Sequence, residues 1–348
     1  MCFARHISVE CVCNVVLGVG MGIFFGMCLF YFEFQPGEEI EMALNYKDIV
    51  HPEDESALRQ LKNTTGVQTL AEQIVHIQAE RLMRHRLMAD CIKISSRQLP
   101  HLYDRWMRIV DKFGIPEPDF FLQQNPTFNA YTAGDKKPFI SVHSALAASI
   151  PDDELDAIVA HECGHILCRH TLYMTVLIIL QTLLSNSSKS VGIPGVSLLT
   201  GSVLTAAYYA ANYWSRRAEY SADRAAVVYC QDQEVVKRAL LRLHGGPFEI
   251  TKDINLDAYL EQTEEFDTDS SESAFGKLLT TYLVKDRSHP FGTERIKEVI
   301  KWGNSAQYRM VLENLAKAPT GNNTNCPNCS RNIEADWKFC RHCGQKLM

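Results

Sequence analysis

Apolar residues form three long uncharged runs in this chain, and the first lies close to the N-terminus. The run from Cys11 to Phe32 contains no charged residue, and Asn14 is its only strongly polar one. At about 1.5 Å per residue, a helix over this run spans roughly 33 Å, enough to cross a bilayer. A cleaved signal peptide is the alternative, but Phe30 to Phe34 offers no small-residue cleavage site. The pattern therefore predicts a transmembrane anchor over residues 11–32.

The same run carries a glycine at every fourth position, at Gly18, Gly22 and Gly26. On a helix these residues share one face, and small residues there let a second helix approach closely. Association of the chain with itself through this face is a hypothesis that follows.

The side of the membrane on which the rest of the chain lies has two opposed indicators. Arg5 precedes the anchor and acidic residues follow it, which favours a cytoplasmic N-terminus and a domain on the far side. Free thiols favour a reducing compartment instead. We therefore favour the cytosol for the domain on the strength of four cysteines without framework spacing: Cys91, Cys163, Cys168 and Cys230.

The other two uncharged runs cover Leu172 to Leu184 and Val191 to Tyr213. The first is expected to continue the helix that precedes it, but it is short for a membrane span. The second is interrupted by Pro194, Gly195 and Gly201. Two membrane-dipping helices are one interpretation, and a hydrophobic hairpin packed on the domain is the favoured one.

Elsewhere the periodicity predicts a mostly helical α+β protein with a small sheet. Strands are expected around Phe120–Leu122 and Phe139–Val142, and a solvated acidic loop over Glu261–Glu272. The expected helices cover residues 53–62, 69–88, 96–113, 152–167, 214–226 and 286–300. The predicted organisation is an anchor (11–32), a helical region (46–118), a main domain (119–315), a linker (316–325) and a small C-terminal module (326–348).

Composition narrows the classes of function. The chain has 348 residues, 46% of them hydrophobic, and a net charge of −6. This is enough apolar material for one substantial core, and the charge gives no reason to expect a nucleic-acid partner.

Candidate chemistry lies in His161-Glu162-Cys163-Gly164-His165, which reads HExxH within a predicted helix. Residues four apart share one helix face, so His161 and His165 can bind one zinc ion. Glu162 is placed to reach a water on that zinc as a general base. A chance match is the alternative.

The third zinc ligand must come from elsewhere, because Cys168 and Thr171 replace the glycine and histidine of an extended motif. His170 is expected to be a polar surface residue. Glu219 and Asp223 lie four apart on a second predicted helix. Glu219 can complete a His-His-Glu site, and Asp223 can accept a hydrogen bond from a ligand imidazole. Solvated acids paired with neighbouring arginines are the alternative.

With this ExxxD pair the chain resembles the zinc metallopeptidases of the HtpX and CAAX-prenyl-protease type, over roughly residues 97–300. Three further segments carry the resemblance: Asn129-Ala130-Tyr131-Thr132, Phe139 to Leu146, and Ser288-His289-Pro290 followed by Arg295. It implies a zinc-dependent endopeptidase, often membrane-associated, that hydrolyses peptide bonds with Glu162 as the base. A role in protein quality control is a further expectation.

The resemblance also suggests roles for residues around the metal. His289 is a candidate donor to the oxyanion, or else a turn residue before Pro290. Arg295 is expected to orient carboxylates near the metal. Phe139 to His143 is either an edge strand that holds an extended substrate or an ordinary core strand. Asn129, Ile140 and Val142 are the expected substrate-binding residues.

A second metal site is predicted at the C-terminus, where two CxxC pairs are separated by ten residues. Four thiolates in two knuckles are typical of a closed, structural zinc site. The ligands would be Cys326, Cys329, Cys340 and Cys343. A disulfide pair or a redox dithiol is the alternative.

The chain is thus expected to hold one catalytic and one structural zinc. The competing class of function is a membrane-bound scaffold that recruits partners through the C-terminal module.

Overall fold

The computed structural model describes residues 44–76, 79–185, 201–272, 289–317, 324–328 and 332–333. The predicted anchor, with Gly18, Gly22 and Gly26, lies outside the described residues, and so do Cys329, Cys340 and Cys343. Within the described part, no single helix has the length and apolar character of a membrane span. The two helices Asp152–Leu167 and Thr171–Leu184 meet that test only as a pair, and they are bent by 100° at their junction.

A four-stranded mixed sheet forms one layer, in the order β1-β2-β4-β3. β2 and β4 are parallel, and the two outer pairs are antiparallel. The strands are β1 (Ile92–Ile94), β2 (Asp119–Gln123), β3 (Ala130–Ala133) and β4 (Phe139–His143). The edge-strand interpretation of Phe139–His143 is therefore wrong. β4 is paired on both sides and all five of its residues are buried, as expected of an apolar central strand.

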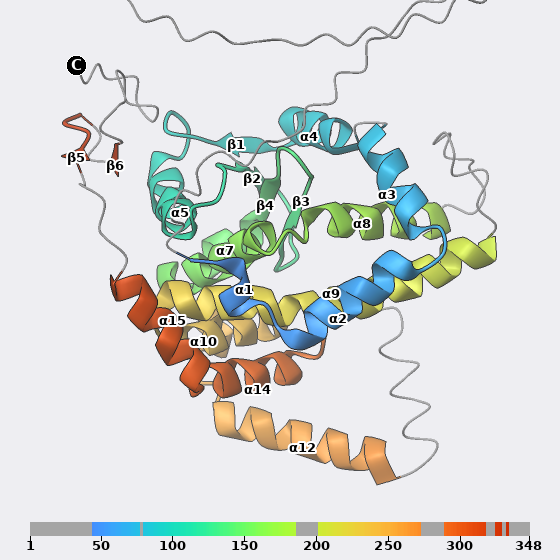
Figure 1. The fold of residues 1–348 in the computed structure, drawn as a ribbon. Helices are drawn as coiled ribbons and strands as arrows, with labels where there is room; N and C mark the ends of the chain where they lie inside the picture. The colour runs from blue at the N-terminus through green and yellow to red at the C-terminus, as the bar shows by residue number, and fades with distance from the viewer. Residues whose placement is uncertain are drawn as a thin grey trace, which may run out of the picture. The chain divides into compact units, whose positions relative to one another are not determined.

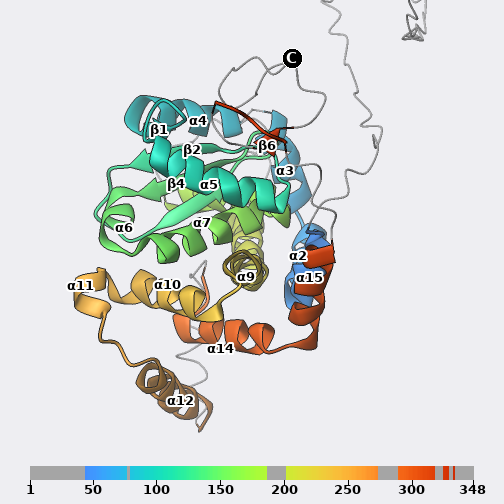
Figure 2. The same ribbon diagram turned by 90° about the vertical axis from the view of Figure 1, so that its left-hand side faces the viewer.

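Helices make up most of the described chain. α7 (Asp152–Leu167) lies between the sheet and α9 (Gly201–Cys230), as both ribbon views show (Figure 1, Figure 2). The helices before α7 are α1 (Tyr46–Ile49), α2 (Pro52–Asn63), α3 (Val67–His76), α4 (Ala79–Asp90), α5 (Pro100–Phe113) and α6 (Ser144–Ser149). Those after it are α8 (Thr171–Ser185), α9, α10 (Gln233–Gly245), α11 (Phe248–Thr251), α12 (Leu256–Glu272), α14 (Gly292–Gly303) and α15 (Ala306–Lys317). A short antiparallel pair, β5 (Thr324–Asn325) and β6 (Asn332–Ile333), lies near the C-terminus.

Two helix predictions and one loop prediction differ from the structure. The helix expected over residues 69–88 is two helices, because α3 buries Leu70 against α2 and α8 whereas α4 buries Leu87 against the sheet. The segment Glu261–Glu272, expected as an acidic loop, is helical, and its described side chains are exposed, since Glu and Gln favour helix even without burial. Finally, α8 does not continue α7, because Arg169 adopts a left-handed conformation (φ 60°) that ends the first helix.

The described parts of the second and third apolar runs pack on the domain, as the hairpin interpretation predicted. Val176 and Leu180 of α8 and Ala211 and Trp214 of α9 lie in one buried cluster with residues of α2 and α3. A larger cluster joins the sheet, α5, α7, α10 and α14. Both clusters border α9, and this places the helix that carries Glu219 against the helix that carries HExxH.

Candidate metal centre and active site

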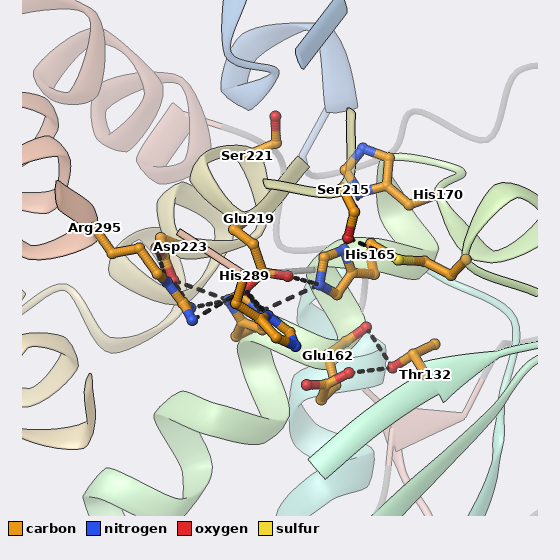
Figure 3. A network of polar contacts seen from close by, with 12 residues as sticks. Thr132, Glu162, His165, His170, Ser215, Glu219, Ser221, Asp223, His289 and Arg295 are labelled. Atoms are coloured by element: carbon orange, nitrogen blue, oxygen red, sulfur yellow. Dashed lines mark hydrogen bonds and ion pairs between the residues drawn. The ribbon is translucent and has the colours of Figure 1, made fainter. Parts of the chain in front are cut away.

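The two histidines of HExxH and Glu219 converge, as the sequence predicted. His161 Nε2 and His165 Nε2 lie 3.2 Å apart, and each lies 3.5 Å from a carboxylate oxygen of Glu219. Among the described residues these three form a group whose candidate ligand atoms all lie within 4.8 Å of one another, and all three side chains are buried. Figure 3 shows Glu219 approaching His165 from the α9 side.

This donor set fits a zinc ion. Two imidazole nitrogens and one carboxylate, with room for a fourth ligand, are the ligands of many catalytic zinc sites. Both Glu219 oxygens are buried and neither makes a hydrogen bond of proper geometry within the described structure. Arg295 Nη1 and His289 Nδ1 each lie 3.0 Å from Oε2. Oε1 has no hydrogen-bond partner among the described residues, and a buried polar atom without a partner is a candidate for binding an ion.

Gly164 allows the two helices to come this close. A Cβ at this position would lie 2.8 Å from the Cβ of Ala225 and 3.1 Å from the Cα of Ala222, both on α9. The motif HExxH allows any residue at the position of Gly164, but in this chain the contact with α9 leaves no room for a side chain there.

Asp223 and Arg295 form a buried ion pair behind His161. Asp223 Oδ1 lies 2.9 Å from His161 Nδ1, and Arg295 donates to Asp223 through Nε at 2.9 Å and Nη2 at 2.6 Å. Burial raises the pKa of Asp223, but Arg295 outweighs it and the net shift is downward. Asp223 is thus held as a carboxylate that accepts the Nδ1 proton of His161, in agreement with the geometry expected from the sequence.

Charged neighbours shift the pKa values of both Glu219 and His161. Burial acts to raise its pKa, but His289, Arg295 and His161 together hold it well below its ordinary value. Burial lowers the pKa of His161, and Glu219 then raises it to about 9. A bound metal would replace that proton, because a ligand imidazole must offer a free lone pair.

Glu162 points into the same space and is held by Thr132, which the sequence analysis named within the segment Asn129–Thr132 without assigning it a role. Thr132 on β3 donates to Glu162 Oε2 at 2.6 Å (Figure 3). The hydroxyl thus holds one carboxylate oxygen of a side chain that lines the cleft beside the candidate ligands. The cleft has a volume of about 270 Å³ and is lined by His161, Glu162, Glu219 and His289 among others.

His289 lies at the mouth of this cleft. Its side chain is 54% exposed, and its contact there is with the Glu219 carboxylate. The suggested role of His289 as an oxyanion donor remains a prediction.

The expected substrate-binding residues are only partly in place. Asn129 is exposed beside the cleft. Ile140 and Val142 are fully buried in the central strand β4, so their assignment to substrate binding is wrong. β3 is the terminal strand next to the site, and a larger groove of about 770 Å³ runs past it between α4 and α8.

His170 is also not where the sequence analysis expected it. It is 1% exposed, and its Nδ1 lies 2.9 Å from Nδ1 of His165. The left-handed Arg169 turns the chain sharply, and the His170 backbone N–H donates to the His165 carbonyl at 2.9 Å. The turn brings the His170 ring against His165, on the side away from Glu162 (Figure 3).

At the C-terminus the structure describes only part of the second candidate metal site. Cys326 is buried next to the β5–β6 pair. The other three cysteines lie outside the described residues, so four-cysteine ligation remains a prediction.

Comparison with known proteins agrees with this geometry. The model of peptidase family M48 matches residues 96–303, and a zinc-ribbon domain model matches residues 322–347. The plastoglobule-localized metallopeptidase 48 of Arabidopsis thaliana is 31% identical over 279 residues, which cover 80% of this chain and 78% of that protein.

Bacterial proteases are similar over shorter stretches. The protease HtpX homolog of Acidiphilium cryptum is 32% identical over 161 residues, 41% of this chain and 56% of the relative. That of Trichormus variabilis is 33% identical over 85 residues, 24% of this chain and 29% of the relative. No solved structure matches the chain. The family match over most of the folded region, and the resemblance of the motifs within it, lead to one conclusion: the chain belongs to peptidase family M48 and carries a C-terminal zinc-ribbon domain.

Proposed function

We propose that this chain is a zinc-dependent endopeptidase whose metal is held by His161, His165 and Glu219. The observation that carries the proposal is the convergence of these three buried groups beside Glu162. Zinc bound there would acidify a coordinated water and polarise the scissile carbonyl. Within family M48 this is also the chemistry that the names of the relatives lead one to expect.

Glu162 is the proposed general base and acid. Its free oxygen accepts a proton from the attacking water and then delivers that proton to the leaving amine. The Thr132 hydroxyl keeps the carboxylate in one rotamer throughout. His289, at the mouth of the cleft, is proposed to exchange its contact with Glu219 for one with the substrate oxyanion.

The substrate is proposed to be an extended polypeptide that pairs with the outer edge of β3. The Asn129 carbonyl accepts from the His143 amide at 3.0 Å. Because antiparallel ladders alternate, the backbone groups of Ala130 and Thr132 then point away from β4, toward an added strand. Backbone pairing requires little sequence preference, which agrees with a role in protein quality control.

Specificity is proposed to come from the groove between α4 and α8, which starts at Glu162 and His165. Its walls carry apolar side chains, so it suits large apolar residues of the substrate. The residues that contribute are Leu82, Met83, Leu87, Ile178, Ile179 and Leu183.

Attachment to a membrane through residues 11–32, with the peptidase domain in the cytosol, is part of the same proposal. It rests on the length and composition of that run. The zinc ribbon is proposed as a separate structural module that contacts a partner or substrate.

The test is cleavage of an unfolded protein such as casein by the purified full-length chain and by Glu162→Gln, with bound zinc quantified in both. Glu154→Gln makes the same chemical change on the same helix, at a buried carboxylate that pairs with Arg242. Cleavage by the wild type and Glu154→Gln only, with equal zinc in all three, supports the proposal. Equal cleavage by Glu162→Gln would remove Glu162 from the mechanism, and zinc binding without cleavage by any chain would favour the scaffold alternative.

A further inference from the structure

A line of buried polar groups leads from the zinc-ligand candidate His165 to a helix outside the matched peptidase region. His165 Nδ1 meets His170 Nδ1 at 2.9 Å, and His170 Nε2 meets Asp54 Oδ2 at 2.9 Å. Asp54 lies on α2, 116 positions before His170 and well before residue 96, where the family match begins. Both Asp54 and His170 are only 1% exposed.

The protons in this line can be assigned from the chemistry of its two ends. A metal at Nε2 of His165 leaves the proton of the neutral ring on Nδ1, where it must be donated to His170. His170 can accept it only if its own Nδ1 is unprotonated, and its proton is then on Nε2. The Asp54 carboxylate, which only accepts, favours that same tautomer.

Three donors hold Asp54 in this role. Besides His170, Trp214 Nε1 donates to Oδ1 at 3.0 Å, and Ser221 Oγ donates to Oδ2 at 2.6 Å. An amide could not replace the carboxylate here, because its NH₂ group would face one of the donors.

We propose that Asp54 positions the zinc ligand His165 through His170, so that α2 is part of the metal site. The inference rests on the proposed function, since it takes His165 as a ligand. Asp223 does the same for His161 through one contact, whereas Asp54 acts through an intervening ring. Carboxylates that orient ligand imidazoles typically change metal affinity by about 10–100-fold when lost.

The first test is the zinc affinity of full-length Asp54→Asn, measured by competition with a chromophoric chelator. The catalytic site is identified in the titration as the zinc that His161→Ala loses, which separates it from zinc at the C-terminal cysteines. We expect Asp54→Asn to weaken that site by about 10–100-fold. The matched control is Glu154→Gln, which removes an equally buried carboxylate without touching a candidate ligand and should leave the zinc affinity unchanged.

A second pair of variants covers the case in which Asp54→Asn does not fold. His170→Phe keeps a ring but removes both contacts, whereas His170→Asn keeps an acceptor near His165 Nδ1. The asparagine should retain more zinc affinity than the phenylalanine. Nitrogen-15 NMR of labelled histidines should also find His170 as the Nε2–H tautomer in the wild type and a changed tautomer balance in Asp54→Asn.

The outcomes separate this inference from the proposed function. If His161→Ala loses no zinc, the metal site itself is wrong. If His161→Ala loses zinc but Asp54→Asn and His170→Phe bind it as the wild type does, the metal site stands and the positioning role of Asp54 is refuted.

Discussion

Replacing Gly164 by alanine tests how closely α7 and α9 must approach to assemble the site. The added Cβ would lie 2.8 Å from Ala225 Cβ, whereas carbon atoms normally rest at about 3.5–4.0 Å. The helices must therefore separate locally by about 1 Å. Overpacking of this kind costs about 1–3 kcal/mol, against about 0.5–1 kcal/mol gained from the better helix propensity of alanine. The net expectation is destabilisation by about 1–2 kcal/mol.

The separation also acts on zinc binding, because His161 and His165 lie on α7 and Glu219 on α9. Urea unfolding monitored by circular dichroism measures the stability, and chelator competition measures the zinc affinity. Gly201→Ala is the matched control, since a Cβ there meets no atom of the described residues within 4 Å. A Gly164→Ala chain that is more stable than the wild type and binds zinc equally well would show that propensity dominates and that the close approach is not required.

The remaining predictions address the base, the groove and one ion pair. Thr132→Val removes the 2.6 Å hydrogen bond to Glu162. We expect kcat on a peptide substrate to fall about tenfold, which corresponds to about 1.4 kcal/mol, with KM little changed. An unaltered kcat would exclude this role of Thr132. Ile178→Glu places a charge in the apolar groove and should raise KM for peptides with large apolar residues more than for those with small ones; equal effects on both would count against the groove. Asp119 pairs with Lys93 at 2.5 Å and also with Arg84. Burial raises its pKa, but these partners lower it overall. Its stabilisation is thus present above the unfolded pKa of about 3.9 and is lost as the pH falls through the lower folded value. Asp119→Asn should therefore flatten the stability profile of urea unfolding below about pH 5, and a profile as steep as that of the wild type would contradict the assignment.

Short-range spacing explains which parts of the site could be predicted. His161 and His165, and likewise Glu219 and Asp223, are four apart on helices, so the helical period alone aligns each pair on one face. That Glu219 lies beside both histidines was inferred from the need for a third zinc ligand, and the distances between Glu219 and both histidines agree with it.

The wrong or absent predictions share one cause, which is that they depend on contacts between residues that no local sequence pattern indicates. The central place of β4 follows from strand order, which joins segments that are not neighbours in the chain. His170 looked like a surface residue because a continuing helix would have turned it away from His165, but the left-handed Arg169 ends that helix. No sequence pattern indicated a role for Asp54, because its partners His170 and Trp214 lie more than a hundred positions away in the chain.

The central claim is that His161, His165 and Glu219 hold one zinc ion beside Glu162. Its most direct test is anomalous diffraction at the zinc absorption edge from crystals of the full-length chain. The account predicts an anomalous peak between the two Nε2 atoms and the Glu219 carboxylate, with nitrogen and oxygen ligands at about 2.0–2.2 Å. Zinc found only among the C-terminal cysteines, with the HExxH histidines free of metal in zinc-replete crystals, would contradict it.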